Sequence, residues 1–135
     1  MKLYIYDHCP FCVKARMIFG LKNLPVELHV LQSDDEATPT RMIGQKMAPI
    51  LQKDDSRYLP ESLDIVHYVD KLDGQPLLTG SRNPKIEEWL RKVNGYVNKL
   101  LIPRFAQAPF DEFSTPQARA YFTAKKEAAI GDFAD

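Results

Sequence analysis

The feature that most constrains this chain is a pair of cysteines, Cys9 and Cys12, placed where an apolar strand passes into a helix. Residues 2–6 are aromatic and β-branched, which is typical of a short buried strand. Residues 13–23 follow a helical pattern, and its predicted apolar face carries Val13, Met17, Leu21 and, just beyond it, Leu24. The chain is therefore expected to begin strand–helix, with both sulfurs at the start of the helix.

That position has chemical consequences for Cys9. We expect Cys9 at or near the N-cap and Pro10 in the first turn, where the missing N–H of proline costs nothing. The free N–H groups and the positive end of the helix dipole favour the thiolate, which is the nucleophilic form. Cys12 follows at the capping-box spacing, so its sulfur can approach that of Cys9. We interpret Cys9 as the attacking thiol and Cys12 as the resolving thiol.

The next elements predict a mixed sheet. Residues 26–31 alternate with period two, so strand, helix and strand form a βαβ unit with a right-handed crossover. Residues 38–44 predict a short helix, and residues 47–59 predict a hairpin in which Pro49 stands at the start of a strand. A helix over residues 60–72 completes the order βαβαββα. This order implies one mixed sheet with helices on both faces.

The composition of the chain then changes at residues 73–83. This stretch contains two glycines, a proline and hydroxyl residues, and it is typical of a linker. We expect a first domain at residues 1–72 and the start of an all-helical domain at residues 84–135.

Two helices are predicted in the second domain. Apolar residues recur at helical spacing from Ile86 to Leu101, which predicts a helix that ends before Pro103. A second helix is predicted to start at residues 114–116. Two helices offer little surface to cover so wide an apolar stripe, so we expect this domain to be incomplete.

Charge and cysteine content exclude several classes of protein. The 135 residues carry 18 basic and 18 acidic side chains, which gives no electrostatic reason to expect nucleic acid or a membrane surface as a partner. No stretch is apolar enough to span a bilayer, and the first residues lack a signal-peptide pattern. Two close cysteines suit a redox pair in a reducing compartment. A cytoplasmic monomer is the default expectation.

At this point the residues resemble a known family, the glutaredoxins, which have the thioredoxin fold. Cys9-Pro10-Phe11-Cys12 is similar to their usual Cys-Pro-Tyr-Cys motif, and Ala48-Pro49 is similar to the cis-proline of that fold. Glu61-Ser62 resembles the glutathione-binding pair of glutathione transferases. The linker and the helical region extend the similarity to the larger, glutathione-transferase-like bacterial glutaredoxins. Members of that group continue through more helices, so the chain is expected to be truncated in its helical domain.

The resemblance implies a function and a set of site residues. The function is that of a glutathione-dependent thiol–disulfide oxidoreductase, which reduces protein disulfides and glutathione mixed disulfides. Glutathione is then a co-substrate, and no permanently bound cofactor is implied. Cys9 and Cys12 would be catalytic, and the glutathione contacts would be Pro10, Phe11, Ala48, Pro49, Glu61 and Ser62.

Within that set, each part of glutathione has an expected partner. The backbone of Ala48 would pair with the cysteinyl part as an added strand. The γ-glutamyl carboxylate would lie at the N-terminus of the helix that starts near Glu61 and Ser62. The glycyl carboxylate has no clear partner, and the candidates are Lys14, Gln45 and Lys46. Phe11 in place of tyrosine removes a hydroxyl and is expected to change thiol reactivity only modestly.

Other interpretations of the same residues stay open. A zinc site would need four ligands, and beside the cysteines the chain offers only His8, His29 and His67. The two cysteines could also be inert core residues. His8 could tune Cys9, although an exposed histidine without consequence is the expected case. Competing functions are a thioredoxin-like reductant, a glutathione transferase and a non-enzymatic glutathione- or protein-binding module.

Overall fold

The computed structural model describes residues 1–134; Asp135, the last residue of the expected helical domain, lies outside the described residues. The first group of elements is β1 (Lys2–Ile5), α1 (Pro10–Leu21), β2 (Glu27–Val30), α2 (Ala37–Ile43), β3 (Ile50–Gln52), β4 (Tyr58–Pro60) and α3 (Ser62–Asp70). The second group is α4 (Pro84–Gln107), the 3-10 helix η1 (Asp111–Phe113) and α5 (Pro116–Ile130). The predicted order βαβαββα, followed by helices, is confirmed.

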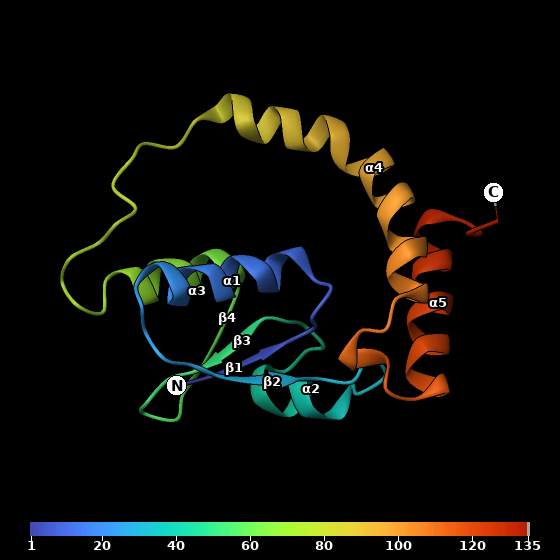
Figure 1. Ribbon diagram of the computed structural model, residues 1–135, viewed down its shortest axis with the longest axis horizontal. Helices are drawn as coiled ribbons and strands as arrows, with labels where there is room; N and C mark the ends of the chain where they lie inside the picture. Colours follow the sequence, from blue (N-terminus) through green and yellow to red (C-terminus); the bar gives the residue numbers. More distant parts are fainter. Residues whose placement is uncertain (135) are drawn as a thin grey trace.

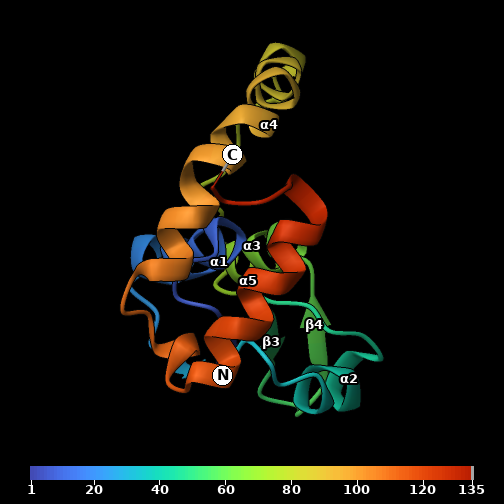
Figure 2. The same cartoon turned by 90° about the vertical axis from the view of Figure 1, so that its right-hand side faces the viewer.

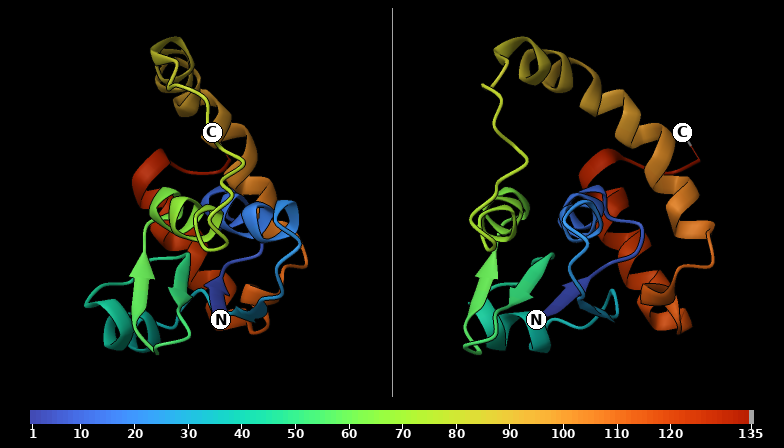
Figure 3. Two further views of the ribbon diagram at one scale, coloured as in Figure 1. Left: turned by 90° about the vertical axis from the view of Figure 1, so that its left-hand side faces the viewer. Right: turned by 60° about the vertical axis from the view of Figure 1, so that its left-hand side comes forward.

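The four strands form one mixed sheet in the order β2-β1-β3-β4. β1 pairs in parallel with β2 and antiparallel with β3, so Leu3 stands between Leu28 and Leu51. β3 and β4 form the predicted hairpin, with Leu51 opposite Leu59. Helices α1 and α3 cover one face of the sheet and α2 lies on the other (Figures 1 and 3). This is a thioredoxin-like domain, as the resemblance implies.

The core lies between this sheet and the helices α1 and α3. It includes Leu3 and Ile5 of β1, Leu51 of β3, and residues of both helices, namely Cys12, Ala15, Ile18, Phe19, Ile65, Val66 and Val69. At roughly 25 cal/mol for each Å² of apolar surface removed from water, such a cluster is the main favourable term in folding. Because Cys12 belongs to this core, the packing that stabilises the domain also fixes the position of the second sulfur.

The buried face of α1 is not the one that the sequence pattern predicts. Val13, Met17 and Leu21 are 40%, 57% and 61% exposed. Helix α1 carries two apolar stripes, and the one that faces the sheet contains the small residues Cys12 and Ala15. Small side chains let the helix approach the sheet closely, whereas periodicity alone cannot choose between two apolar stripes.

Helix α3 ends at a buried carboxylate, that of Asp70, which binds the chain that follows it. Asp70 accepts hydrogen bonds from the N–H groups of Leu77 (2.8 Å) and Leu78 (3.0 Å). The ammonium group of Lys22 lies 3.7 Å from Asp70 and 2.8 Å from Asp73. These contacts attach the first part of the predicted linker to α1 and α3.

Helix α4 is longer than predicted, because it continues past Pro103 to Gln107. A proline inside a helix removes one backbone hydrogen bond, to the residue four positions earlier, and commonly bends the helix. Figure 1 shows that α4 curves along its length. The last turn is nevertheless retained, since Ala106 is buried against Phe113 and Phe122.

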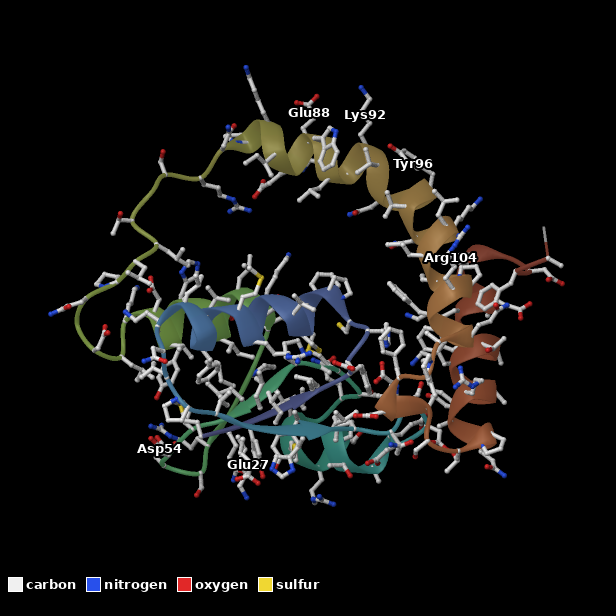
Figure 4. All side chains as sticks on the ribbon, viewed as in Figure 1. Glu27, Asp54, Glu88, Lys92, Tyr96 and Arg104 are labelled. Carbon is white, nitrogen blue, oxygen red and sulfur yellow. The ribbon has the colours of Figure 1, made fainter. Side chains whose placement is uncertain are left out.

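Most of the apolar stripe of α4 is uncovered within residues 1–134. Ile86, Trp89 and Tyr96 are 58%, 60% and 58% exposed, whereas Val93 is buried. Glu88, Lys92 and Tyr96 point outward from the helix (Figure 4). Within the described residues this stripe therefore remains largely exposed to solvent, as expected, because two helices offer too little surface to cover it.

The C-terminal elements η1 and α5 pack beside the first domain (Figure 2). The side chain of Gln32 donates to the carbonyl oxygen of Asp111 (2.9 Å) and accepts from the hydroxyl of Ser114 (2.6 Å). The N–H of Ser33 donates to the carbonyl oxygen of Glu112 (2.9 Å). The loop after β2 thus holds the segment between α4 and α5 in place.

Candidate active site

Cys9 is the N-cap residue of α1, as predicted. Its carbonyl oxygen accepts from the N–H of Val13 at 3.0 Å, and Pro10 occupies the first helical position. Cys9 is 9% exposed and Cys12 is 0% exposed, and neither is in a disulfide. The first sulfur therefore lies at the edge of the core and the second behind it.

The two sulfurs are placed in opposite electrostatic environments. A hydrogen bond from the Cys12 thiol is the largest cause that lowers the pKa of Cys9 to about 6, against the opposing effect of burial. The N–H groups of Cys12 and Phe11 and the charge on His8 act in the same direction. The contact with Cys9, followed by burial, raises the pKa of Cys12 well above its usual range. At neutral pH the pair therefore holds one thiolate, on Cys9, and one thiol, on Cys12.

A cavity of about 490 Å³ opens beside Cys9 between the two halves of the molecule. Its lining from the first domain includes Tyr6, His8, Cys9, Pro10, Phe11, Ser33, Lys46 and Ala48. Helices α4 and α5 contribute Asn94, Val97, Asn98, Leu101, Ile102, Phe105, Tyr121, Phe122, Lys125 and Lys126. Four of the sequence-predicted site residues, Cys9, Pro10, Phe11 and Ala48, thus meet at one cavity.

The other predicted glutathione contacts lie outside the lining of that cavity. The Ala48–Pro49 peptide bond is cis, as expected, and Pro49 is buried. Glu61 precedes α3 with a left-handed φ of 71° and is exposed, and Ser62, the first residue of α3, is buried. Both residues are therefore at a helix N-terminus, the position that the resemblance implies for them.

Of the three candidates for the glycyl carboxylate, only Lys46 lines the cavity. Its ammonium group lies over the rings of Tyr6 (5.2 Å) and Tyr121 (5.1 Å). Burial, followed by the neighbouring Lys125, lowers the pKa of Lys46. By contrast, Lys14 lies over the ring of Phe11, 5.2 Å from its centroid. Lys125 and Lys126 line the cavity together with Lys46, so this wall carries basic side chains.

His8 is not the exposed, inconsequential residue that the sequence led us to expect. Its side chain is 12% exposed and contacts a carboxylate oxygen of Glu112, a residue that is completely buried. The N–H groups of Asp7 and His8 also donate to Glu112, each at 3.0 Å. The loop that leads into Cys9 is therefore bound by an acidic side chain from η1.

Two family models match the sequence, one for each half of the chain. Residues 3–77 match the model described as glutathione S-transferase, N-terminal domain, and residues 85–135 match the model described as glutaredoxin 2, C-terminal domain. The chain belongs to the glutathione S-transferase N-terminal domain family. The thioredoxin-like domain of this family accounts for the first half of the chain, and the recognised resemblance to glutathione-transferase-like glutaredoxins is confirmed.

Similar proteins and structures agree with this assignment. Glutaredoxin 2 of Escherichia coli (strain K12) is 79% identical over 135 residues, which are 100% of this chain and 63% of that protein. The crystal structure of glutaredoxin 2 from Salmonella typhimurium in complex with glutathione has a TM-score of 0.95 and 83% sequence identity, covering 98% of this chain and 61% of that one. A Tau class glutathione S-transferase from mango shares the fold at 20% identity, with a TM-score of 0.56 over 95% of this chain and 58% of that one. The chain thus spans less than two thirds of the length of its curated glutaredoxin 2 relatives.

Two further observations concern metals and membranes. Among residues 1–134, no three His, Cys, Asp or Glu side chains are grouped so that they could hold a metal ion. In the same part of the chain, every helix is too short or too polar to cross a bilayer.

Sequence reasoning missed the residues that the second domain contributes to the site. Glu112, Lys125 and Lys126 come from η1 and α5, more than a hundred residues after the cysteine motif. No local pattern marks them, because an acidic residue in a short connection and lysines on a helix are ordinary surface features. Only the packing of the two halves brings them to Cys9.

Proposed function

We propose that this protein is a glutathione-dependent thiol–disulfide oxidoreductase, a glutaredoxin that reduces protein disulfides and glutathione mixed disulfides. The observation that carries the proposal is the ionised Cys9 at the N-terminus of α1, with the protonated Cys12 behind it. A thiolate attacks a disulfide sulfur, and a second thiol in reach can resolve the product. The name of the similar Escherichia coli protein and the glutathione-bound Salmonella structure support the same conclusion.

With a glutathione mixed disulfide as substrate, Cys9 alone can perform the exchange. The Cys9 thiolate attacks the glutathione sulfur, the old S–S bond breaks, and the client cysteine leaves as a thiolate that takes up a proton. A second glutathione, as its thiolate, then attacks the glutathione sulfur bound to Cys9. This step releases glutathione disulfide and regenerates the Cys9 thiolate.

With a protein disulfide as substrate, both sulfurs take part. Cys9 attacks one client sulfur, and the other client sulfur leaves as a thiolate and is protonated. Cys12 then loses its proton and attacks Cys9, which releases the second client thiol and leaves a Cys9–Cys12 disulfide. Two glutathione molecules reduce this disulfide and become glutathione disulfide. The buried position of Cys12 suits a thiol that meets only Cys9.

The cavity beside Cys9 is the proposed binding site for glutathione. Ala48 would pair its backbone with the cysteinyl part, and Pro10, Phe11 and Pro49 would bound the site on either side. The start of α3, at Glu61 and Ser62, would hold the γ-glutamyl carboxylate.

The remaining carboxylate of glutathione, on the glycyl residue, would be held by Lys46. This choice rests on the position of Lys46 in the lining of the cavity. Two lysines of α5, Lys125 and Lys126, line the same cavity and add to the positive charge there. An anionic tripeptide suits such a wall.

We also propose that the chain divides into a thioredoxin-like domain at residues 1–72, a linker at 73–83 and a helical domain at 84–135. We place the protein in the cytoplasm, where reduced glutathione is supplied, and we propose that it acts as a monomer on disulfide-bonded or glutathionylated proteins.

The proposed function is tested with glutathione, glutathione reductase and two substrates, a glutathionylated peptide and a protein disulfide. We expect Cys9→Ser to lose activity toward both, because no other described thiol can replace the nucleophile. Cys12→Ser should keep activity toward the glutathionylated peptide and lose most activity toward the protein disulfide. An inactive wild type in this assay, with full activity through thioredoxin reductase, would instead support a thioredoxin-like reductant.

A further inference from the structure

The buried carboxylate of Glu112 makes several contacts with the loop before Cys9. Glu112 is 0% exposed, and one of its oxygens accepts from the N–H of Asp7 while the other accepts from the N–H of His8, both at 3.0 Å. The second oxygen also contacts Nδ1 of His8. A buried charge is retained only when it is paired and hydrogen-bonded, and Glu112 is satisfied entirely by this loop within the described residues.

The imidazole of His8 is enclosed on its other sides by aromatic rings. The rings of Phe105, Phe110, Phe113 and Phe122 lie 5.0 to 5.9 Å from it, centroid to centroid, and Tyr6 lies at 6.1 Å. All four phenylalanines belong to the second half of the chain. The helical segment thus packs against the thioredoxin-like domain around His8.

The titratable and charged groups around His8 come from three directions. Glu112 reaches it from η1, Tyr6 and Cys9 flank it in the segment between β1 and α1, and Lys126 lies on α5 with its ammonium group 5.6 Å from the centre of the Phe122 ring. Glu112 is the group that contacts the imidazole directly.

His8 and Glu112 act on different sulfurs of the dithiol. The charge on His8 favours the thiolate of Cys9, whereas the charge on Glu112 disfavours ionisation of Cys12. The positive end of the pair thus acts on the attacking thiol and the negative end acts on the resolving thiol. Both effects keep the proton on Cys12 and off Cys9.

From this geometry we infer that Glu112 is a positioning residue for the dithiol: by binding His8 and the backbone before Cys9, it makes the reactivity of Cys9 depend on the docking of the helical segment. The inference rests on the proposed function in that Cys9 is the nucleophile. It assigns to η1 a role in the chemistry that goes beyond covering the first domain. Glu112 acts through His8 and does not itself touch the reacting sulfur.

The test is the rate at which iodoacetamide alkylates Cys9 between pH 4 and 10, in a Cys12→Ser background that leaves one thiol. We expect Glu112→Gln to move the midpoint of this profile upward by about half a unit to one unit, which lowers the rate at pH 5 by roughly 3- to 10-fold. At pH 10 the rates should agree within about twofold, because Cys9 is then ionised in both proteins. Glu88→Gln, an exposed change on α4, is the matched control and should leave the profile unchanged.

Two additional variants separate charge from structure. His8→Gln removes the positive end of the pair and should shift the midpoint in the same direction as Glu112→Gln. In the double variant, the two neutral amides can still hydrogen-bond to each other, so we expect better thermal stability than in Glu112→Gln alone. Its midpoint should equal that of Glu112→Gln, in which the charge pair is already lost, and should not exceed that of His8→Gln, which keeps the buried carboxylate.

An unchanged midpoint in Glu112→Gln, or a rate lowered equally at every pH, would overturn the inference, because either result means that Glu112 acts only on stability. Alkylation requires no glutathione, so the result does not depend on whether the coupled glutathione assay succeeds. An inactive wild type in that assay, with a shifted alkylation profile, would refute the proposed function and leave the role of Glu112 intact.

Discussion

At the scale of single residues, Cys9 and Cys12 differ in pKa because the fold places two identical side chains in different environments. Cys9 meets the N–H groups at the start of α1 and accepts a hydrogen bond from the thiol of Cys12, whereas Cys12 is enclosed in the core. The N-terminus of a helix favours a negative charge, and burial in an apolar region disfavours one. This difference supports the proposed roles of Cys9 as attacking thiol and Cys12 as resolving thiol.

The lowered pKa of Cys9 predicts a pH dependence of both reactivity and stability. The alkylation rate of wild-type Cys9 should be half its maximum at about pH 6. Because the pKa of a thiol in the unfolded chain is about 8.5, the ionised Cys9 stabilises the fold fully above that value. This contribution is lost as the pH falls toward the folded pKa.

Urea unfolding of the reduced protein at several pH values measures the stability effect. The free energy of unfolding of the wild type, minus that of Cys9→Ser, should decrease as the pH is lowered from about 8.5 to about 6. A difference that does not vary with pH, together with an alkylation midpoint near 8.5, would contradict the ionised state of Cys9.

At the scale of elements, the helices show which features a sequence pattern can specify. The N-cap of α1, the helix α2 and the hairpin were predictable, since each depends on residues that are neighbours in sequence. The buried face of α1 and the end of α4 were not, because they depend on packing against distant elements. Pro103 is a helix-ending signal by itself, and only the burial of Ala106 against Phe113 and Phe122 explains why the helix continues.

The exposed stripe of α4 predicts the fluorescence of this protein. Trp89 is the single tryptophan and is 60% exposed. Its emission should match that of N-acetyltryptophanamide in water, should be quenched by iodide to a similar extent, and should change little on unfolding in urea. A blue-shifted emission that iodide cannot quench would show that this part of α4 is covered in solution.

At the scale of the whole molecule, the cavity beside Cys9 exists only because two halves of the chain meet. Cys9, Pro10, Phe11 and Ala48, which the sequence predicts as site residues, line one cavity, since motif spacing and fold topology determine their positions. Sequence reasoning missed Glu112, because a contact across 104 positions leaves no trace in local composition. The fold of the first domain was thus largely predictable, whereas the second wall of the site was not.

Disruption of the aromatic cluster between the two halves should lower the free energy of unfolding. Phe113 is 5% exposed and its ring lies 4.9 Å from that of Phe122 and 5.8 Å from that of His8. Phe113→Ala should lower the free energy of unfolding by about 3 kcal/mol, the lower end for a buried phenylalanine, because this cluster is small. Urea denaturation measures the change, and limited proteolysis should show earlier cleavage in residues 108–115.

The control for this variant is Leu63→Ala. Leu63 lies on α3 and is 55% exposed, so its truncation should change stability by less than about 0.5 kcal/mol. Equal effects of the two substitutions would mean that the Phe113 cluster does not hold the halves together.

The distance along the chain between His8 and Glu112 also has a consequence for synthesis. Glu112 is added to the growing chain 104 residues after His8. At translation rates of roughly 5–20 residues per second, this gap lasts on the order of 5 to 20 seconds. During that interval the nascent chain carries both thiols without Glu112, so the proposed role of this carboxylate predicts a lower Cys9 reactivity in the nascent chain than in the finished protein.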